Sequence, residues 1–69
     1  MVEVFKTNIQ RKQTADKIKM ELLLLFPDCK INFDLEDCDR ILRIESAHDV
    51  GKTIEEEMIR RGFYCEVLP

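Results

Sequence analysis

Residues 29–45 read CKINFDLEDCDRILRIE, and this stretch decides the fold. Apolar and polar residues alternate over 29–35 and again over 40–45, which is the period of a β-strand with one buried face. The polar residues 36–39 between them, EDCD, are typical of a turn. The sequence therefore predicts a β-hairpin with one polar face. Its inward side chains are expected to be Ile31, Phe33, Leu35, Leu42 and Ile44.

A helix is predicted before the hairpin, over residues 11–26. The segment RKQTADKIKMELLLLF contains neither glycine nor proline and is rich in residues with high helix propensity. Pro27 followed by Asp28 ends it. Upstream, β-branched, aromatic and charged residues mix over 2–8 and predict a first strand. Helical spacing predicts one buried stripe made of Ala15, Ile18, Leu22 and Leu25.

A second helix is predicted after the hairpin, within residues 46–63, SAHDVGKTIEEEMIRRGF. Ser46 or Asp49 offers a side-chain oxygen that can cap the free amides of the first turn. Gly62 is placed to end the helix in a left-handed conformation. Residues 64–69, YCEVLP, then predict a short last strand. The buried stripe of this helix is expected to be Val50, Ile54 and Met58.

The order of these segments is strand, helix, strand, strand, helix, strand. Two right-handed crossovers place both helices on the same face of an antiparallel sheet. The sequence therefore predicts a single domain over residues 1–69 with the α+β ferredoxin-like βαββαβ fold, a four-stranded antiparallel sheet covered by two helices on one face.

The composition limits the classes of partner that the protein can bind and the compartments in which it can work. The formal net charge is −3, which argues against a nucleic-acid partner because such proteins concentrate positive charge. The longest apolar run, LLLLFP, is too short to span a bilayer, and the N-terminus lacks the features of a signal peptide. Three widely spaced cysteines make a poor disulfide framework and fit a reducing compartment. We expect a cytoplasmic protein without a membrane partner.

The chain resembles the heavy-metal-associated domain, the fold of small copper chaperones and of the N-terminal modules of metal-pumping ATPases. Residues 59–69, IRRGFYCEVLP, look like the closing segment of that family, with an aliphatic residue, polar residues, glycine, an aromatic residue and the last strand. Residues 30–46, KINFDLEDCDRILRIES, resemble its central hairpin. The resemblance covers nearly the whole chain and implies the same fold.

The chemistry of that family depends on a Met-x-Cys-x-x-Cys motif in the first loop, where two thiolates hold a soft metal ion. The cysteine positions correspond approximately to Ile9 and Lys12, and residues 6–18 contain no Cys, His or Met. Metal transfer in the manner of the family is therefore not expected. Three interpretations of this segment remain open: a solvated connection, a metal site elsewhere, and a basic patch for an acidic partner or small anion. The patch would consist of Lys6, Arg11, Lys12 and Lys17.

A metal site elsewhere would have to draw on Cys29, Cys38, Cys65 and His48, no pair of which has C-x-x-C spacing, and Cys38 is the candidate that remains. Cys29 and Cys38 should lie at opposite ends of one strand, roughly 20 Å apart at the rise of a β-strand. Cys65 is expected to pack as a small hydrophobe. The acidic residues around Cys38 lack the spacing of a calcium loop and predict a solvated turn or an acidic docking surface. They are Asp34, Glu36, Asp37 and Asp39.

No enzyme is predicted, and no cofactor. His48 stands alone before a helix and has no partner set for nucleophilic catalysis. The consecutive glutamates at 55–57 point in different directions around a helix and do not form a catalytic pair.

The remaining candidate surface is the open face of the sheet, where Phe5, Ile41 and Tyr64 are expected to form a small apolar interface. Strand 29–35 at the sheet edge also offers backbone groups to a partner. We therefore expect a non-catalytic interaction or regulatory module that binds a protein partner or a second copy of itself. The alternative is a protein that handles a soft metal such as copper or zinc through a nonstandard or dimer-bridging site.

Overall fold

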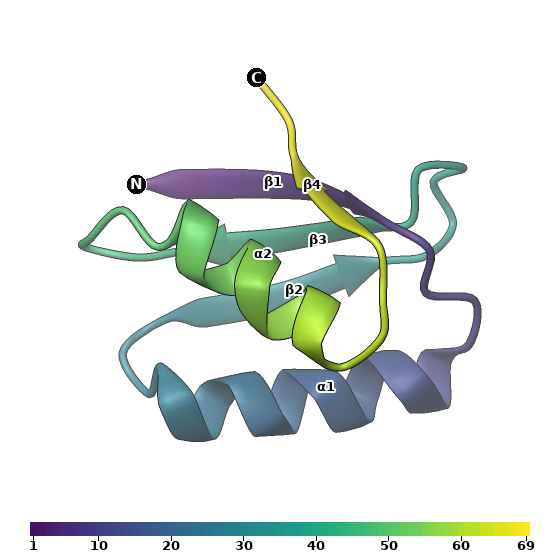
Figure 1. Ribbon diagram of the computed structural model, residues 1–69, viewed down its shortest axis with the longest axis horizontal. Coiled ribbons are helices and arrows are strands. Elements are labelled where there is room, and N and C mark those ends of the chain that lie inside the picture. The colour runs from purple at the N-terminus through teal and green to yellow at the C-terminus, as the bar shows by residue number, and fades with distance from the viewer.

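The computed structural model describes all residues, 1–69, as one four-stranded sheet and two helices (Figure 1). The strand order is β2-β3-β1-β4, and every neighbouring pair is antiparallel. This confirms the predicted α+β ferredoxin-like arrangement. The elements are β1 (Val2–Thr7), α1 (Lys12–Leu25), β2 (Lys30–Asp34), β3 (Ile41–Glu45), α2 (Gly51–Arg60) and β4 (Cys65–Val67).

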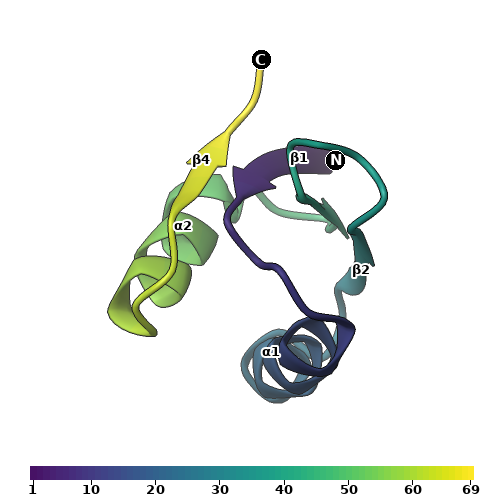
Figure 2. The same ribbon diagram turned by 90° about the vertical axis from the view of Figure 1, so that its right-hand side faces the viewer.

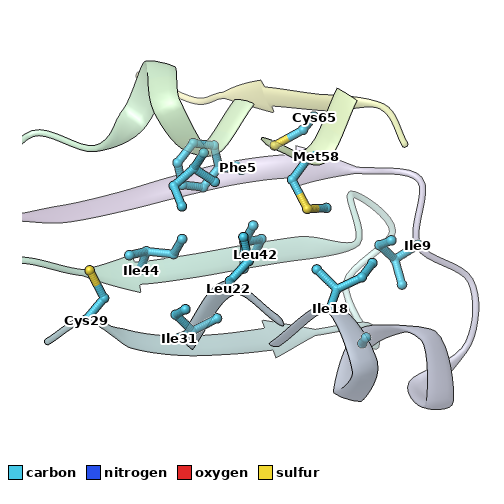
Figure 3. Packing of buried hydrophobic residues seen from close by; sticks show 12 residues of the cluster. Phe5, Ile9, Ile18, Leu22, Cys29, Ile31, Leu42, Ile44, Met58 and Cys65 are labelled. Carbon is cyan, nitrogen blue, oxygen red and sulfur yellow. The ribbon is translucent and has the colours of Figure 1, made fainter. Parts of the chain in front are cut away.

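Both helices lie on the same side of the sheet, as the view along the strands shows (Figure 2). The core fills the space between the sheet and this helical layer (Figure 3). Its largest fully buried side chains come from the first loop and from four of the elements, β1, α1, β3 and α2, because each of these elements carries one apolar face. They are Phe5, Ile9, Leu22, Leu42, Ile44, Ile54 and Met58.

The central hairpin has the predicted register. Ile31 lies opposite Ile44, and Phe33 lies opposite Leu42, so their side chains share the inner face. On the other side of β3, Phe5 lies opposite Leu42. The inner face is therefore continuous across β2, β3 and β1, and the helices cover it.

Helix α1 buries Ala15, Ile18 and Leu22, as its spacing predicts. Leu25 was expected in the same stripe, but it is half-exposed. It is the last residue of the helix, and the half-buried Phe26 that follows packs against the core in its place. At the end of the helix, Phe26 thus makes the core contact that was predicted for Leu25.

Helix α2 begins at Gly51, later than the expected segment. The residue at the cap position is Val50, which has no side-chain oxygen of its own. Instead the Ser46 hydroxyl accepts the backbone N–H of His48 at 3.1 Å, and the Asp49 carboxylate accepts that of Gly51 at 3.2 Å. Of the two predicted residues, Asp49 thus satisfies a free amide of the first turn of α2, whereas Ser46 stabilises the turn before the helix.

The end of α2 is as predicted. Gly62 has a φ of 88°, in the left-handed region. Its N–H donates to the carbonyl of Ile59 at 2.9 Å, and the N–H of Phe63 donates to that of Met58 at 3.1 Å. This pair of bonds is the Schellman arrangement, which directs the chain back towards β4.

Candidate functional site

The loop between β1 and α1 is held by hydrogen bonds of Thr7 and by the burial of Ile9 in the core. The Thr7 hydroxyl donates to the carbonyl oxygen of Arg40 at 2.6 Å and accepts the backbone N–H of Ile9 at 3.2 Å. The side chain of Ile9 is fully buried (Figure 3). Ile9 is therefore part of the core, and its aliphatic side chain has no atom that could bind a metal ion.

The cations near this loop are dispersed. Lys12 is exposed at the start of α1, with its Nζ 3.3 Å from Oδ2 of Asp16. The Lys6 ammonium lies 3.7 Å from a carboxylate oxygen of Asp39, on the hairpin turn. Two of the four cations of the expected basic patch are thus paired with separate carboxylates. Lys17 instead lines a hollow of about 470 Å³ between α1 and the turn after α2.

Cys38 lies at the exposed tip of the β2–β3 hairpin, as predicted. One ligand atom each from Asp37, Cys38 and Asp39 lies within 4.8 Å of the others. The Asp37 carboxylate also accepts the backbone N–H of Asp39 at 2.9 Å. Arg40 ends this turn with a φ of 50°, and its guanidinium donates to the carbonyl of Leu35 at 2.9 Å. The turn is a compact, exposed set of two carboxylates and one thiol.

The other cysteines are buried, Cys29 beside the end of α1 and Cys65 on β4 (Figure 3). Burial, together with the nearby Glu55 carboxylate, raises the pKa of the Cys65 thiol to about 12. Cys65 therefore remains a neutral thiol at neutral pH, which suits neither a nucleophile nor a metal ligand.

His48 and the three glutamates of α2 do not form one cluster of side chains. His48 is exposed in the loop before the helix. Glu55 accepts the backbone N–H of Val67 at 2.8 Å, whereas Glu57 pairs with arginines at the end of α2, and Glu56 is exposed. The glutamates therefore point to different parts of the surface.

The open face of the sheet differs from the expected one at β1. Phe5 was predicted there, but it is fully buried on the inner face. Ile41 is half-buried on β3, whereas Tyr64 is exposed just before β4, on the other side of β1. The predicted apolar cluster of Phe5, Ile41 and Tyr64 is therefore wrong. Val2 and Val4 occupy the open face of β1 instead, together with Lys6.

The edge strands differ in how their outward backbone groups are used. At β4, the carboxylate of Glu55 takes the N–H of Val67 at 2.8 Å. That contact covers the edge of a strand only three residues long. Strand β2, at the opposite edge, is five residues long and has no neighbouring strand on its outer side.

The pattern of the ladder tells which groups of β2 face outward. Met1, just before β1, and Ser46, just after β3, exchange backbone hydrogen bonds and extend the ladder between these strands. Bonded and non-bonded pairs alternate in an antiparallel ladder, so Ile44 and Leu42 bond to β1. The intervening residues of β3 then bond to Lys30, Asn32 and Asp34. The N–H and C=O groups of Ile31 and Phe33 are thereby directed to the free edge.

Two shallow grooves follow this free edge between β2 and α1. One, of about 330 Å³, runs beside Asn32, Phe33 and Asp34. The other, of about 290 Å³, runs beside Lys30, Ile31 and Asn32, and Lys19 of α1 borders both. The edge is therefore open along its whole length. The sequence indicated an edge strand here, but the residues with free backbone groups follow only from the ladder.

Exposed apolar side chains are a further feature of the surface. Leu24 is 84% exposed and Met20 is 69% exposed, one turn apart on the outer side of α1. Ile59 on α2 is also exposed. No helix of the chain has the length and apolar character that crossing a membrane requires.

Comparisons with protein-family models, with curated proteins and with solved structures find no match to this chain.

Proposed function

We propose that this protein is a non-catalytic interaction module that binds an extended segment of a protein partner along the free edge of β2. The observation that carries the proposal is the pair of residues Ile31 and Phe33, whose backbone N–H and C=O groups face outward. Such an edge is a template for an added strand, because the main chain supplies hydrogen bonds and alternate side chains supply specificity.

The surroundings of this edge support the same function. The grooves between β2 and α1 leave room for an added strand, and the accessible part of their apolar lining comes from Leu23, Phe33 and Leu35. Each of these side chains is half-buried, so a partner would complete its burial. Elsewhere, the neutral Cys65 thiol and the separated glutamates of α2 supply no nucleophile with an adjacent base.

We also propose that the protein works in the cytoplasm as a regulatory or assembly module. All three cysteines are free thiols, and Cys38 is exposed. A reducing compartment preserves an exposed thiol, whereas an oxidising one converts it to a disulfide.

The test is selection of a displayed random-peptide library against the protein, followed by NMR of the strongest binders. We expect the selected peptides to slow hydrogen exchange at the amides of Ile31 and Phe33. The amide of Asn32 is the internal control, because it already bonds to β3 and is protected without a partner. Binders that protect other surfaces, or no binders at all, would overturn the proposal.

A second candidate function is metal handling at the hairpin tip, which the grouping of Asp37, Cys38 and Asp39 favours. One thiolate and two carboxylates suit zinc better than copper(I), which prefers sulfur ligands. Two chains together would supply two thiolates, one Cys38 from each, and carboxylates that could complete a tetrahedral site.

This candidate is tested by anaerobic titration of the reduced protein with zinc and with copper(I) against a competing chelator. A site at the tip requires that Cys38→Ser abolish binding, while Cys29→Ser leaves it unchanged. A stoichiometry of one metal per two chains would indicate a bridging site. If the protein takes no metal from the chelator, this candidate is eliminated and the interaction module stands alone.

A further inference from the structure

Strand β2 has a pattern that complements itself when it is reversed. From Lys30 to Asp34 it reads Lys, Ile, Asn, Phe, Asp, with opposite charges at its ends, apolar residues next to them and an amide at its centre. We propose that the partner of this edge is β2 of a second copy of the chain, paired antiparallel and centred on Asn32. The inference rests on the proposed function, since it names the occupant of the same edge.

In this register the opposite charges meet. Lys30 of one copy lies opposite Asp34 of the other, and the same contact occurs twice because the pairing is symmetric. Neither Lys30 nor Asp34 forms an ion pair within its own chain. Asp34 accepts only the backbone N–H of Glu36, at 3.2 Å, so its other oxygen is free. Opposite charges at facing positions stabilise an antiparallel pair.

The outward backbone groups of β2 fit this register and disfavour registers that are shifted along the strand. Ile31 of one copy lies opposite Phe33 of the other, and both present outward N–H and C=O groups, so each such pair exchanges two hydrogen bonds. A shift by one residue would place outward groups opposite groups that bond to β3. A shift centred on Phe33 would place Lys30 opposite Glu36, which lies beyond the end of β2.

The side chains on the inner face also benefit. Phe33 is half-buried at the edge of the core, and Ile31 of the second copy would lie against it. The paired strands are short, so the buried area is at the small end for a protein interface, and we expect a weak, concentration-dependent dimer. The opposite edge of the sheet does not offer the same contact, because Glu55 covers β4.

The inference is tested by sedimentation equilibrium of the full chain and of two charge variants, Lys30→Asp and Asp34→Lys. The native protein should dimerise, and each variant alone should associate at least about tenfold more weakly, because like charges then meet at both ends. An equal mixture of the two variants should form a mixed dimer, since each altered residue then faces a charge of opposite sign. Lys17→Asp, on α1, is the matched control and should dimerise as the native protein does.

A second readout locates the contact. On raising the concentration of the native protein, hydrogen exchange should slow at Ile31 and Phe33, with little change at Asn32. Circular dichroism and urea midpoints of the variants establish that they are folded. The inference is overturned if the native protein stays monomeric, if the mixture of variants does not associate, or if another surface becomes protected. Peptide binding at β2 by a monomeric protein would overturn this inference and leave the proposed function intact.

Discussion

Cys38 and Cys65 show how position in the fold sets the chemistry of a single residue. Cys38 is exposed at a hairpin tip, whereas Cys65 packs in the core beside Glu55. Burial of a thiol disfavours its charged form, which raises the pKa of Cys65 to about 12. The two residues should therefore differ in reactivity, because the thiolate is the reactive form and must also be reached by the reagent.

We predict that, at pH 8, a thiol reagent such as Ellman's reagent reacts rapidly with Cys38 alone in the folded protein. Cys29 and Cys65 should react only at the rate at which the chain opens, and all three thiols should react rapidly in urea. The absorbance of the thiolate that the reagent releases measures the rate of each reaction directly. The Cys38→Ser variant should lose the rapid phase, and a rapid phase that survives in it would contradict the assignment.

At the same scale, Phe5 explains why the sequence misplaced part of the open face. Val2, Val4 and Phe5 are all apolar, so the alternation of β1 fits either phase. The structure buries Phe5 and Thr7, because the larger aromatic side chain gains more from burial and the Thr7 hydroxyl is satisfied by Arg40. Ile9 gave no periodic signal at all, since it lies in a loop, and its burial depends on tertiary packing.

Among the elements, α2 ends in a turn that requires a left-handed residue. Gly62 has a φ of 88°, and an added Cβ there would meet nothing within 4 Å. The cost of Gly62→Ala is therefore backbone strain alone, and we predict a loss of about 1–2 kcal/mol in the free energy of unfolding. Urea denaturation measures it. Gly62→Asn should cost less, because asparagine tolerates this region, and equal losses for both variants would argue against strain as the cause.

Helix α1 has an apolar residue on nearly every side of its second half, and burial separates their roles. Leu22 is fully buried, whereas Leu24 is 84% exposed. We predict that Leu22→Ala lowers the free energy of unfolding by about 3–5 kcal/mol, while Leu24→Ala leaves it within about 0.5 kcal/mol. Both are read from urea denaturation. If Leu22→Ala is too unstable to study, Ile18→Val should cost about 0.5–1.5 kcal/mol, and a large effect of Leu24→Ala would show an unrecognised contact.

The same elements show how far the sequence predicts this fold. The hairpin, both helices and the left-handed end of α2 follow from local patterns, because alternation, helix propensity and glycine act over a few residues. The sequence leaves open whether Ser46 or Asp49 serves the start of α2, and the structure shows that Asp49 bonds to Gly51 of the first turn while Ser46 bonds to His48 ahead of the helix. The free groups of Ile31 and Phe33 depend on how β1, β3 and β2 pair, which no local pattern contains.

For the molecule as a whole, one charged cluster connects the two helices. Nε of Arg61, after α2, lies 2.8 Å from a carboxylate oxygen of Glu21 on α1, and its NH1 group lies 2.7 Å from Oε1 of Glu57. The same NH1 also donates to the carbonyl of Glu57 at 3.0 Å. Arg61 thus joins the helical layer across the hollow between α1 and the turn before β4.

This cluster makes stability depend on pH in the acid range. The hydrogen bond from Arg61 lowers the pKa of Glu57 from its usual value of 4.5. When the pKa of a carboxyl group is lower in the folded state than in the unfolded chain, the ionised group stabilises the folded state at any pH above the unfolded pKa. That stabilisation is lost as the pH falls through the folded pKa. We therefore predict that the urea midpoint decreases below about pH 4.5 and that Arg61→Gln makes this decrease shallower. Arg43→Gln, on the open face without an ion pair, is the control and should leave the slope unchanged. Equal slopes for the native protein and Arg61→Gln would show that the cluster does not couple protonation to folding.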